Sequence, residues 1–194
     1  MADWNSLEDQ LKALGVQMGK DKRLTNKRAG KHPIEKVVSG EFWEMLTGEV
    51  FCHEEFYPVD YIHGSKPLTP QDPIEVLCQW AGAQQLSLTD LQDFIFLDTE
   101  TSGLAGGTGT YAFEVGLGRF TPGGFRLAQF FMRHPGEEPA LLSGLNSFME
   151  GMRAVVTYNG KAFDIPLLNT RYTMMGMDTP STELTISTYY RWPG

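Results

Sequence analysis

In the stretch FIFLDTETSGL, residues 94–104, an unbroken apolar run ends in two carboxylates. Such a short apolar run is typical of a strand that is buried on both faces. Asp98 and Glu100 follow it one residue apart, and side chains two positions apart on a strand share a face, about 6.5–7 Å from each other along the chain. Two carboxylates held there repel, and one is driven towards protonation unless a cation lies between them. The pair therefore suggests a bound cation.

The chain is long enough, at 194 residues, for one sizeable core with a small appendage. Its 41% hydrophobic and 21% charged residues are typical of a globular protein and exclude disorder throughout. No run approaches the roughly 18–20 apolar residues of a membrane span, and residues 1–15 lack the layout of a signal peptide. Cys52 and Cys78 have no metal-type spacing, so we expect a cytoplasmic protein with free thiols, a disulfide being the alternative.

Charge is divided unevenly along the chain. Residues 1–36 hold eight of the 16 Lys and Arg and five of the 24 Asp and Glu, so residues 37–194 hold eight against nineteen. The basic stretch 19–32 is predicted to be a flexible linker, with a tail that contacts nucleic acid as the alternative. A polyanion normally binds a basic surface. If the acidic remainder handles nucleic acid, it therefore needs metal ions to offset its own charge.

The spacing of hydrophobic residues predicts an α/β protein. Helical periodicity indicates helices over residues 4–14, 72–82, 137–152 and 164–177. Alternation or short apolar runs indicate strands within 33–63 and over 94–98, 111–120, 125–133 and 154–158. The turn TPGG makes 111–120 and 125–133 an antiparallel hairpin. We divide the chain into an N-terminal helix with a basic linker, a small α+β segment and an α/β domain, over residues 1–32, 33–92 and 93–194.

The glycine-rich loop over residues 103–110 is not predicted to bind a dinucleotide. A Rossmann loop opens a helix, whereas this loop opens an alternating strand, and it lacks the Gly-Lys-Ser/Thr of a phosphate loop. We expect a connection that passes close to a ligand-bearing strand end.

The stretch VVTYNGKAFDIPLL, residues 155–168, predicts strand, turn and helix, although Asn-Gly is also a strong hairpin signal. The residues after the turn keep helical spacing, and Pro166 suits a first helical turn. Asp164 then starts the helix, where a capping role is one interpretation. Beside a strand ending in Asp98 and Glu100, it would instead complete an oxygen-rich pocket for Mg²⁺ or Mn²⁺. Two such ions about 3.5–4 Å apart would clamp a phosphodiester.

These motifs resemble those of the DEDD 3′–5′ exonucleases, which have a ribonuclease-H-like fold. FLDTETSGL resembles their Asp-x-Glu motif, and YNGKAFDIPLL resembles their Asn-x-x-x-Phe-Asp-x-Pro motif. The longer string LDTETSGLAGGTGTYAFEVGLGRF is similar to YprB-type ribonuclease-H-like domain proteins in particular. The resemblance covers about residues 34–180. It implies a mixed sheet with flanking helices, a nucleic-acid partner with a single-stranded end, and two Mg²⁺ or Mn²⁺ ions as cofactors.

The resemblance also implies roles for individual residues. The catalytic carboxylates, which are also the metal ligands, would be Asp98, Glu100 and Asp164. The substrate would be contacted by Thr101, Asn159, Lys161 and Phe163. We expect Lys161 to meet substrate phosphate, and the alternative is a solvated lysine in a turn. Ser102 stands where a Thr is expected.

One ligand of the family has no match in this chain. The third motif, Tyr or His followed four residues later by Asp, is absent after Asp164, since Asp178 has Met174 at that spacing. We interpret the tail over residues 185–194 as a shifted reading frame, with a divergent natural tail as the alternative. On that interpretation the domain is truncated and lacks a sheet strand and the helix that bears the last ligand.

Three functions are compatible with these motifs. The first is a metal-dependent 3′–5′ exonuclease, and the second is a non-catalytic nucleic-acid-binding module of the same fold, which the missing Asp favours. The third is an unrelated metal phosphohydrolase that uses the same carboxylates. The residues do not distinguish a DNA substrate from an RNA substrate.

Overall fold

The computed structural model describes residues 32–71, 75–76, 90–103, 109–180 and 184–188. The chain divides into two compact units, Met1–Val37 and Val38–Gly194. In the first unit, the described residues include the short 3₁₀ helix η1 (Ile34–Lys36). The helix predicted over 4–14 lies outside the described residues, as does all of the predicted linker except His32.

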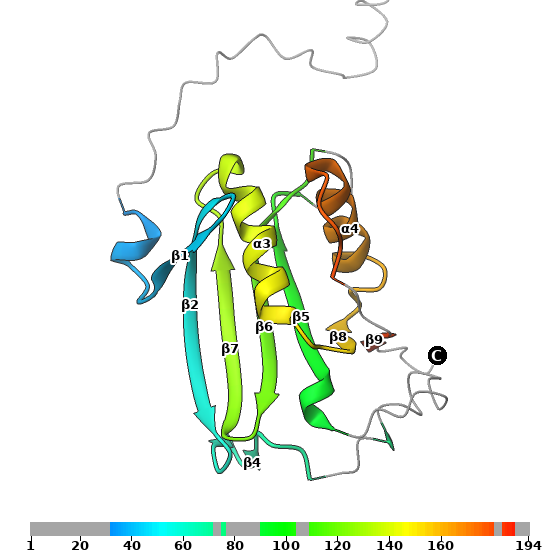
Figure 1. Ribbon diagram of the computed structural model, residues 1–194. Helices are drawn as coiled ribbons and strands as arrows, with labels where there is room; N and C mark the ends of the chain where they lie inside the picture. The colour runs from blue at the N-terminus through cyan, green and yellow to red at the C-terminus, as the bar shows by residue number, and fades with distance from the viewer. Residues whose placement is uncertain (1–31, 72–74, 77–89, 104–108, 181–183, 189–194) are drawn as a thin grey trace, which may run out of the picture. The chain divides into compact units, whose positions relative to one another are not determined.

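The second unit is built on a mixed sheet, which contains seven strands among the described residues (Figure 1). In their order across the sheet, the strands are β1 (Glu41–Met45), β2 (Gly48–Pro58), β7 (Gly124–Phe131), β6 (Ala112–Thr121), β5 (Phe94–Thr101), β8 (Ala154–Tyr158) and β9 (Leu184–Thr188). The strands β5, β8 and β9 are parallel to one another, and the other neighbours are antiparallel. A separate two-stranded ribbon pairs β3 (Ile62–His63) with β4 (Lys66–Pro67).

The sequence predicted the centre of this sheet well. The hairpin of β6 and β7 is confirmed, with Thr121 opposite Gly124. Gly124 has a φ of +149°, and a Cβ there would collide with the backbone of Tyr57 and Pro58. The strand β5 continues past Asp98 because its pairing with β6 continues.

The sheet contains strands from both the predicted α+β segment and the predicted α/β domain. The predicted boundaries at residues 32 and 92 stay predictions.

The edge strand β9 corrects the expectation that the chain lacks a sheet strand here. It pairs in parallel with β8, with Ile186 opposite Val156. Ile186 is buried, and the β-branched residues of the run TIST suit a pleated strand. The pairing with β8 therefore makes a strand of part of the tail, whereas residues 189–194 lie outside the described residues.

Two helices, α3 (Glu138–Met149) and α4 (Asp164–Met175), lie on the same side of the sheet (Figure 1). The 3₁₀ turns η3 (Pro135–Glu137) and η2 (Leu91–Asp93) lead into α3 and β5. Both predicted helices are confirmed, and α4 ends at Gly176, whose left-handed φ of 65° closes the last turn. Of the helix predicted over 72–82, only Glu75 and Val76 are described, and both are helical. No helix in the described part of the chain is long and apolar enough to cross a membrane.

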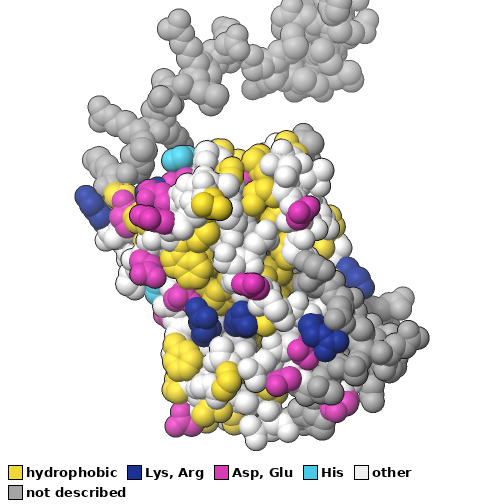
Figure 2. Space-filling view, viewed as in Figure 1, with side chains coloured by type: hydrophobic (Ala, Val, Ile, Leu, Met, Phe, Trp, Pro, Cys, Tyr) yellow, Lys and Arg dark blue, Asp and Glu magenta, His cyan; other side chains and the backbone are white. Residues whose placement is uncertain are grey.

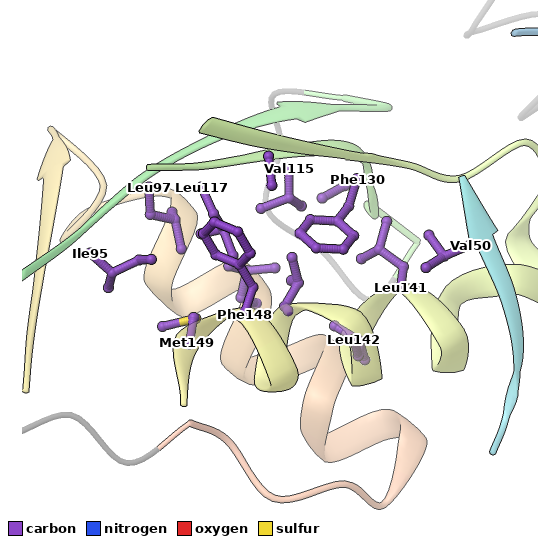
Figure 3. Packing of buried hydrophobic residues seen from close by; sticks show 14 of the residues in the cluster. Val50, Ile95, Leu97, Val115, Leu117, Phe130, Leu141, Leu142, Phe148 and Met149 are labelled. Carbon is purple, nitrogen blue, oxygen red and sulfur yellow. The ribbon is translucent and has the colours of Figure 1, made fainter. Parts of the chain in front are cut away.

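The hydrophobic core fills the space between the sheet and these two helices (Figure 3). Its labelled members are Val50, Ile95, Leu97, Val115, Leu117 and Phe130 from the strands and Leu141, Leu142, Phe148 and Met149 from α3. The two helices are joined by a buried ion pair, in which Arg171 Nη2 lies 2.5 Å from Glu138 Oε2. The hydroxyl of Tyr172 also donates to the carbonyl of Leu142, at 3.1 Å. The confirmed fold is therefore a mixed sheet with helices packed on one face.

Candidate active site

The Asp-x-Glu carboxylates point away from α3 and α4. Side chains alternate along β5, and Ile95 and Leu97 are buried in the core beneath the helices. Asp98 and Glu100 therefore project from the opposite face, and both are exposed. We call this face, which no described helix covers, the open face, and the other the helix-covered face. Asp98 lines a cleft of about 560 Å³ on the open face.

The cleft next to Asp98 has an aromatic floor. The rings of Phe96 and Phe125 line the cleft and pack edge to face with centroids 5.9 Å apart, and the ring of Phe120 packs against both, at 5.9 and 4.8 Å. Two glycines of β6 shape the surface. The ring of Phe125 lies over Gly118, where a Cβ would collide with it, and Gly116 pairs directly with Asp98 and leaves open space beside it. The cleft therefore joins an apolar, aromatic surface to an exposed carboxylate.

A further carboxylate, which no motif in the sequence indicates, faces the Asp-x-Glu pair. Glu114 of β6 lies directly opposite Glu100 in the antiparallel register. Gln129 Nε2 donates to Glu114 Oε1 at 2.8 Å. Like charges at directly opposed positions destabilise a sheet. Within the described ranges, no Lys or Arg forms an ion pair with Asp98, Glu100 or Glu114.

Asp164 lies beside the end of β5, but on its helix-covered side. It is the first residue of α4 and is 8% exposed. The hydroxyl of Thr99, the residue between the two motif carboxylates, donates to Asp164 Oδ1. The hydroxyl of Thr157 lies 3.5 Å from Asp164 Oδ2. The capping position belongs to Phe163, which makes no side-chain capping bond, so the capping interpretation of Asp164 is wrong.

Three of the predicted substrate-contacting residues lie together in the turn from β8 to α4. Asn159 has a left-handed φ of 56°, Lys161 is exposed, and Phe163 is 61% exposed. Tyr158, at the end of β8, is 69% exposed and also lines the cleft. The fourth, Thr101, ends β5 just past a bulge, and its hydroxyl donates to the carbonyl of Gly103 at 3.1 Å.

The donor set at the end of β5 has the chemistry of a site for a hard cation. Mg²⁺ and Mn²⁺ prefer carboxylate oxygens, and the exposed pair Asp98 and Glu100 supplies them without a compensating cation from the described residues. As the side chains stand, no three His, Cys, Asp or Glu residues of the described ranges converge closely enough to hold a metal ion. Asp164 lies on the other face of β5, where its carboxylate accepts a hydrogen bond from the hydroxyl of Thr99.

The order of the strands, the two helices on one face and the carboxylates on the central strand β5 are the features to compare with known families. The family model of the RNase H superfamily matches residues 95–192, which begin in β5 and run through β9. The chain therefore belongs to the RNase H superfamily, as the motifs predicted.

A particular relative is known from Bacillus subtilis (strain 168). The chain is 30% identical over 183 residues to its uncharacterized protein YprB, and the match covers 88% of the chain. The same match covers 44% of YprB, so the chain spans less than half the length of this relative.

Proposed function

We propose that this protein hydrolyses phosphodiester bonds in nucleic acid, removing nucleotides from a 3′ end in a metal-dependent reaction. Membership of the RNase H superfamily supports nuclease-type chemistry. The observation that carries the proposal is the exposed pair Asp98 and Glu100 on the open face, where Asp98 lines the cleft and neither carboxylate has a Lys or Arg partner among the described residues. A bound cation would relieve the repulsion within such a pair, and divalent cations are the ions that two-metal nucleases use.

Charge supports the same location for the substrate. Figure 2 shows the side that carries the helices, where acidic and basic side chains are interspersed among hydrophobic ones. Arg126, for example, is paired with Glu54 at 2.6 Å. A polyanion binds where positive charge is concentrated. In a protein of net charge −8, cations bound by Asp98 and Glu100 would supply that concentration on the open face.

The proposed roles of the residues follow from where they lie. Asp98 and Glu100 would hold Mg²⁺ or Mn²⁺ from the open face, and Asp164 would complete the ligand set from the start of α4. When bound, the two ions would supply an activated water and stabilise the leaving oxygen. The exposed ammonium group of Lys161 would contact phosphate, because it lies in the turn beside this strand end.

The bases of the substrate would meet aromatic side chains. Tyr158 and Phe163 are exposed on either side of the turn, so their rings are accessible to the bases of a bound strand. Stacking of unpaired bases on such rings is worth about 1–3 kcal/mol per base. Asn159 and Thr101 would shape the pocket around the terminal nucleotide. The preferred substrate is therefore a single-stranded end.

A non-catalytic nucleic-acid-binding module is the second candidate. It is favoured by the side chains as they stand, because no three His, Cys, Asp or Glu residues of the described ranges converge closely enough to hold a metal ion. It would use the same aromatic turn and the same Lys161, without cleavage.

We also infer that the protein works in the cytoplasm. Cys52 is a free thiol, which is typical of proteins in a reducing compartment. Cell fractionation with detection of the intact chain tests this location, and recovery with secreted proteins would contradict it.

End-labelled single-stranded DNA and RNA, incubated with the full chain and either Mn²⁺ or EDTA, test the activity. We expect mononucleotides to be released from the 3′ end with Mn²⁺ only. Asp98→Asn and Glu100→Gln should abolish release, whereas Asp60→Asn, at an exposed turn residue, should not change it. Without metal, Asp98→Asn should unfold at the same or a higher temperature, because it relieves repulsion.

The other outcomes identify the alternatives. Metal-dependent binding of the labelled strands without cleavage would select the binding module. Cleavage of a small phosphoester, with polynucleotides untouched, would select a phosphohydrolase. Release that persists unchanged in Asp98→Asn would overturn the assignment of the site.

A further inference from the structure

We propose that Thr99, assisted by Thr157, is a positioning residue that fixes the carboxylate of Asp164 at the end of β5. The inference rests on the proposed metal-dependent function, in which Asp164 is a ligand. It concerns the middle position of the Asp-x-Glu motif, whose side chain points away from the carboxylates on either side of it.

The alternation of side chains along β5 directs Thr99 towards Asp164. Asp98 and Glu100 project from the open face, so Thr99 projects from the helix-covered face, towards the start of α4. Its hydroxyl donates to Asp164 Oδ1, across 65 residues of sequence. The end of β5 therefore carries two carboxylates on the open face, and on the helix-covered face it carries the hydroxyl that binds the third carboxylate, Asp164.

A second strand supports the same carboxylate. Thr157 of β8 lies beside Leu97 in the parallel register, and its hydroxyl is 3.5 Å from Asp164 Oδ2. Gly160 closes the turn above, where a Cβ would collide with both Thr157 Oγ1 and Asp164 Oδ2. The carboxylate is thus enclosed by two strands and the turn, with a hydroxyl beside each of its oxygens.

A second buried carboxylate shows why the choice of partner matters. Glu138 and Asp164 are each the first residue of a helix, and both are buried. Glu138 accepts from Arg171 at 2.5 and 2.6 Å, so its charge is neutralised and its role is structural. Asp164 accepts from hydroxyl groups, which orient a carboxylate without cancelling its charge. Its charge remains available to a cation.

Mn²⁺ affinity of the full chain, measured by the paramagnetic broadening of backbone NMR signals near β5, tests the proposal. Outer-sphere partners of metal ligands typically change metal affinity by 10–100-fold when removed. We therefore expect Thr99→Val, which keeps the β-branched shape but lacks the hydroxyl, to weaken Mn²⁺ binding about tenfold. Thr99→Ser, which restores the hydroxyl, should recover the affinity to within about twofold.

The matched control is Thr170→Val. Thr170 is exposed on α4, and its hydroxyl donates to the carbonyl of Pro166 at 2.8 Å, so the same chemical change there should leave Mn²⁺ affinity unaltered. The dispersion of the NMR spectrum reports whether each variant folds. If Thr99→Val does not fold, Thr157→Val serves in its place, with a smaller loss expected because its contact is longer.

Asp164→Ala separates this inference from the proposed function. If Asp164→Ala leaves Mn²⁺ binding unchanged, Asp164 is not a ligand, and both the ligand assignment and the positioning role fail. If Asp164→Ala weakens binding but Thr99→Val does not, only the positioning role is overturned. In the Asp164→Ala background, adding Thr99→Val should have no further effect. A further loss would show that Thr99 acts independently of Asp164 and would also overturn the inference.

Discussion

The two faces of the central sheet differ in what their side chains do. On the helix-covered face, Val115, Leu117 and Phe130 are fully buried beneath the helices. On the open face, residues of the same strands line a cleft that ends at Asp98, and Leu127 is among them. Because side chains alternate, a single strand serves both faces. Neighbouring residues of one strand therefore serve the core and the proposed active site, and substitutions one position apart should have separable effects.

The largest expected effect lies where the helix-covered face is held together. Arg171→Met leaves the buried carboxylate of Glu138 without its partner, in a pair whose side chains are 9% and 4% exposed. We expect the free energy of unfolding to fall by about 3–5 kcal/mol, because an uncompensated buried charge is costly. Urea denaturation followed by circular dichroism measures this loss. Adding Glu138→Met should recover much of the stability, and a loss that persists in the double variant would contradict the explanation.

A matched pair of leucines measures the difference between the faces directly. Leu145 of α3 is 0% exposed, and Leu145→Ala should lower the free energy of unfolding by about 2–5 kcal/mol through the cavity that it leaves. Leu127 is half-buried on the open face, so Leu127→Ala should cost less than about 1.5 kcal/mol. Thermal and urea unfolding of both variants give the comparison. Equal losses of unfolding free energy would mean that Leu127 on the open face is as deeply buried as Leu145.

A pH dependence should come from the carboxylate that leads into α3. Burial pushes the pKa of Glu137 upward, but the hydrogen bonds from the backbone and guanidinium of Arg133, together with its charge, outweigh this and hold the pKa below its usual value. A depressed carboxyl pKa stabilises the fold above the unfolded pKa, about 4.3. That stability is lost as the pH falls through the folded pKa.

Melting temperatures between pH 3 and 6 test this sign. Wild type should lose stability on acidification more steeply than Glu137→Gln, which has no proton to bind there. Glu150→Gln, at an exposed residue after α3, is the control and should follow wild type. Parallel curves for wild type and Glu137→Gln would show that the ion pair with Arg133 contributes nothing to the acid response.

The smallest effect concerns reactivity and not stability. Cys52 lies on the helix-covered face of β2, where burial and then the charges of Glu54 and Glu41 raise the pKa of its thiol to about 12. At pH 8 very little thiolate is present, so iodoacetamide should label Cys52 slowly in the native protein and rapidly in urea. Peptide mapping by mass spectrometry measures the two rates. Rapid native labelling would show that this face opens readily.

Local patterns predicted the elements that the structure confirms. The apolar run AVVTY became β8, the alternation around Phe120 became β6, and the helical spacing that follows Pro166 became α4. These features depend on neighbouring residues and on the periods of strand and helix, which a sequence displays directly. β9 was missed because its five residues gain their stability from pairing with β8.

The residue types and the spacing of Asp98 and Glu100 by themselves determined that two carboxylates share one face of a strand, and they predict a bound cation between them. Only the tertiary structure decided which face that is, that Glu114 lies opposite Glu100, and that Thr99 holds Asp164 on the other side. The physical reason is the distance along the chain over which each feature is set. Alternation along a strand is a local property, whereas strand register and the placement of a helix on one face follow from the packing of segments far apart in the chain.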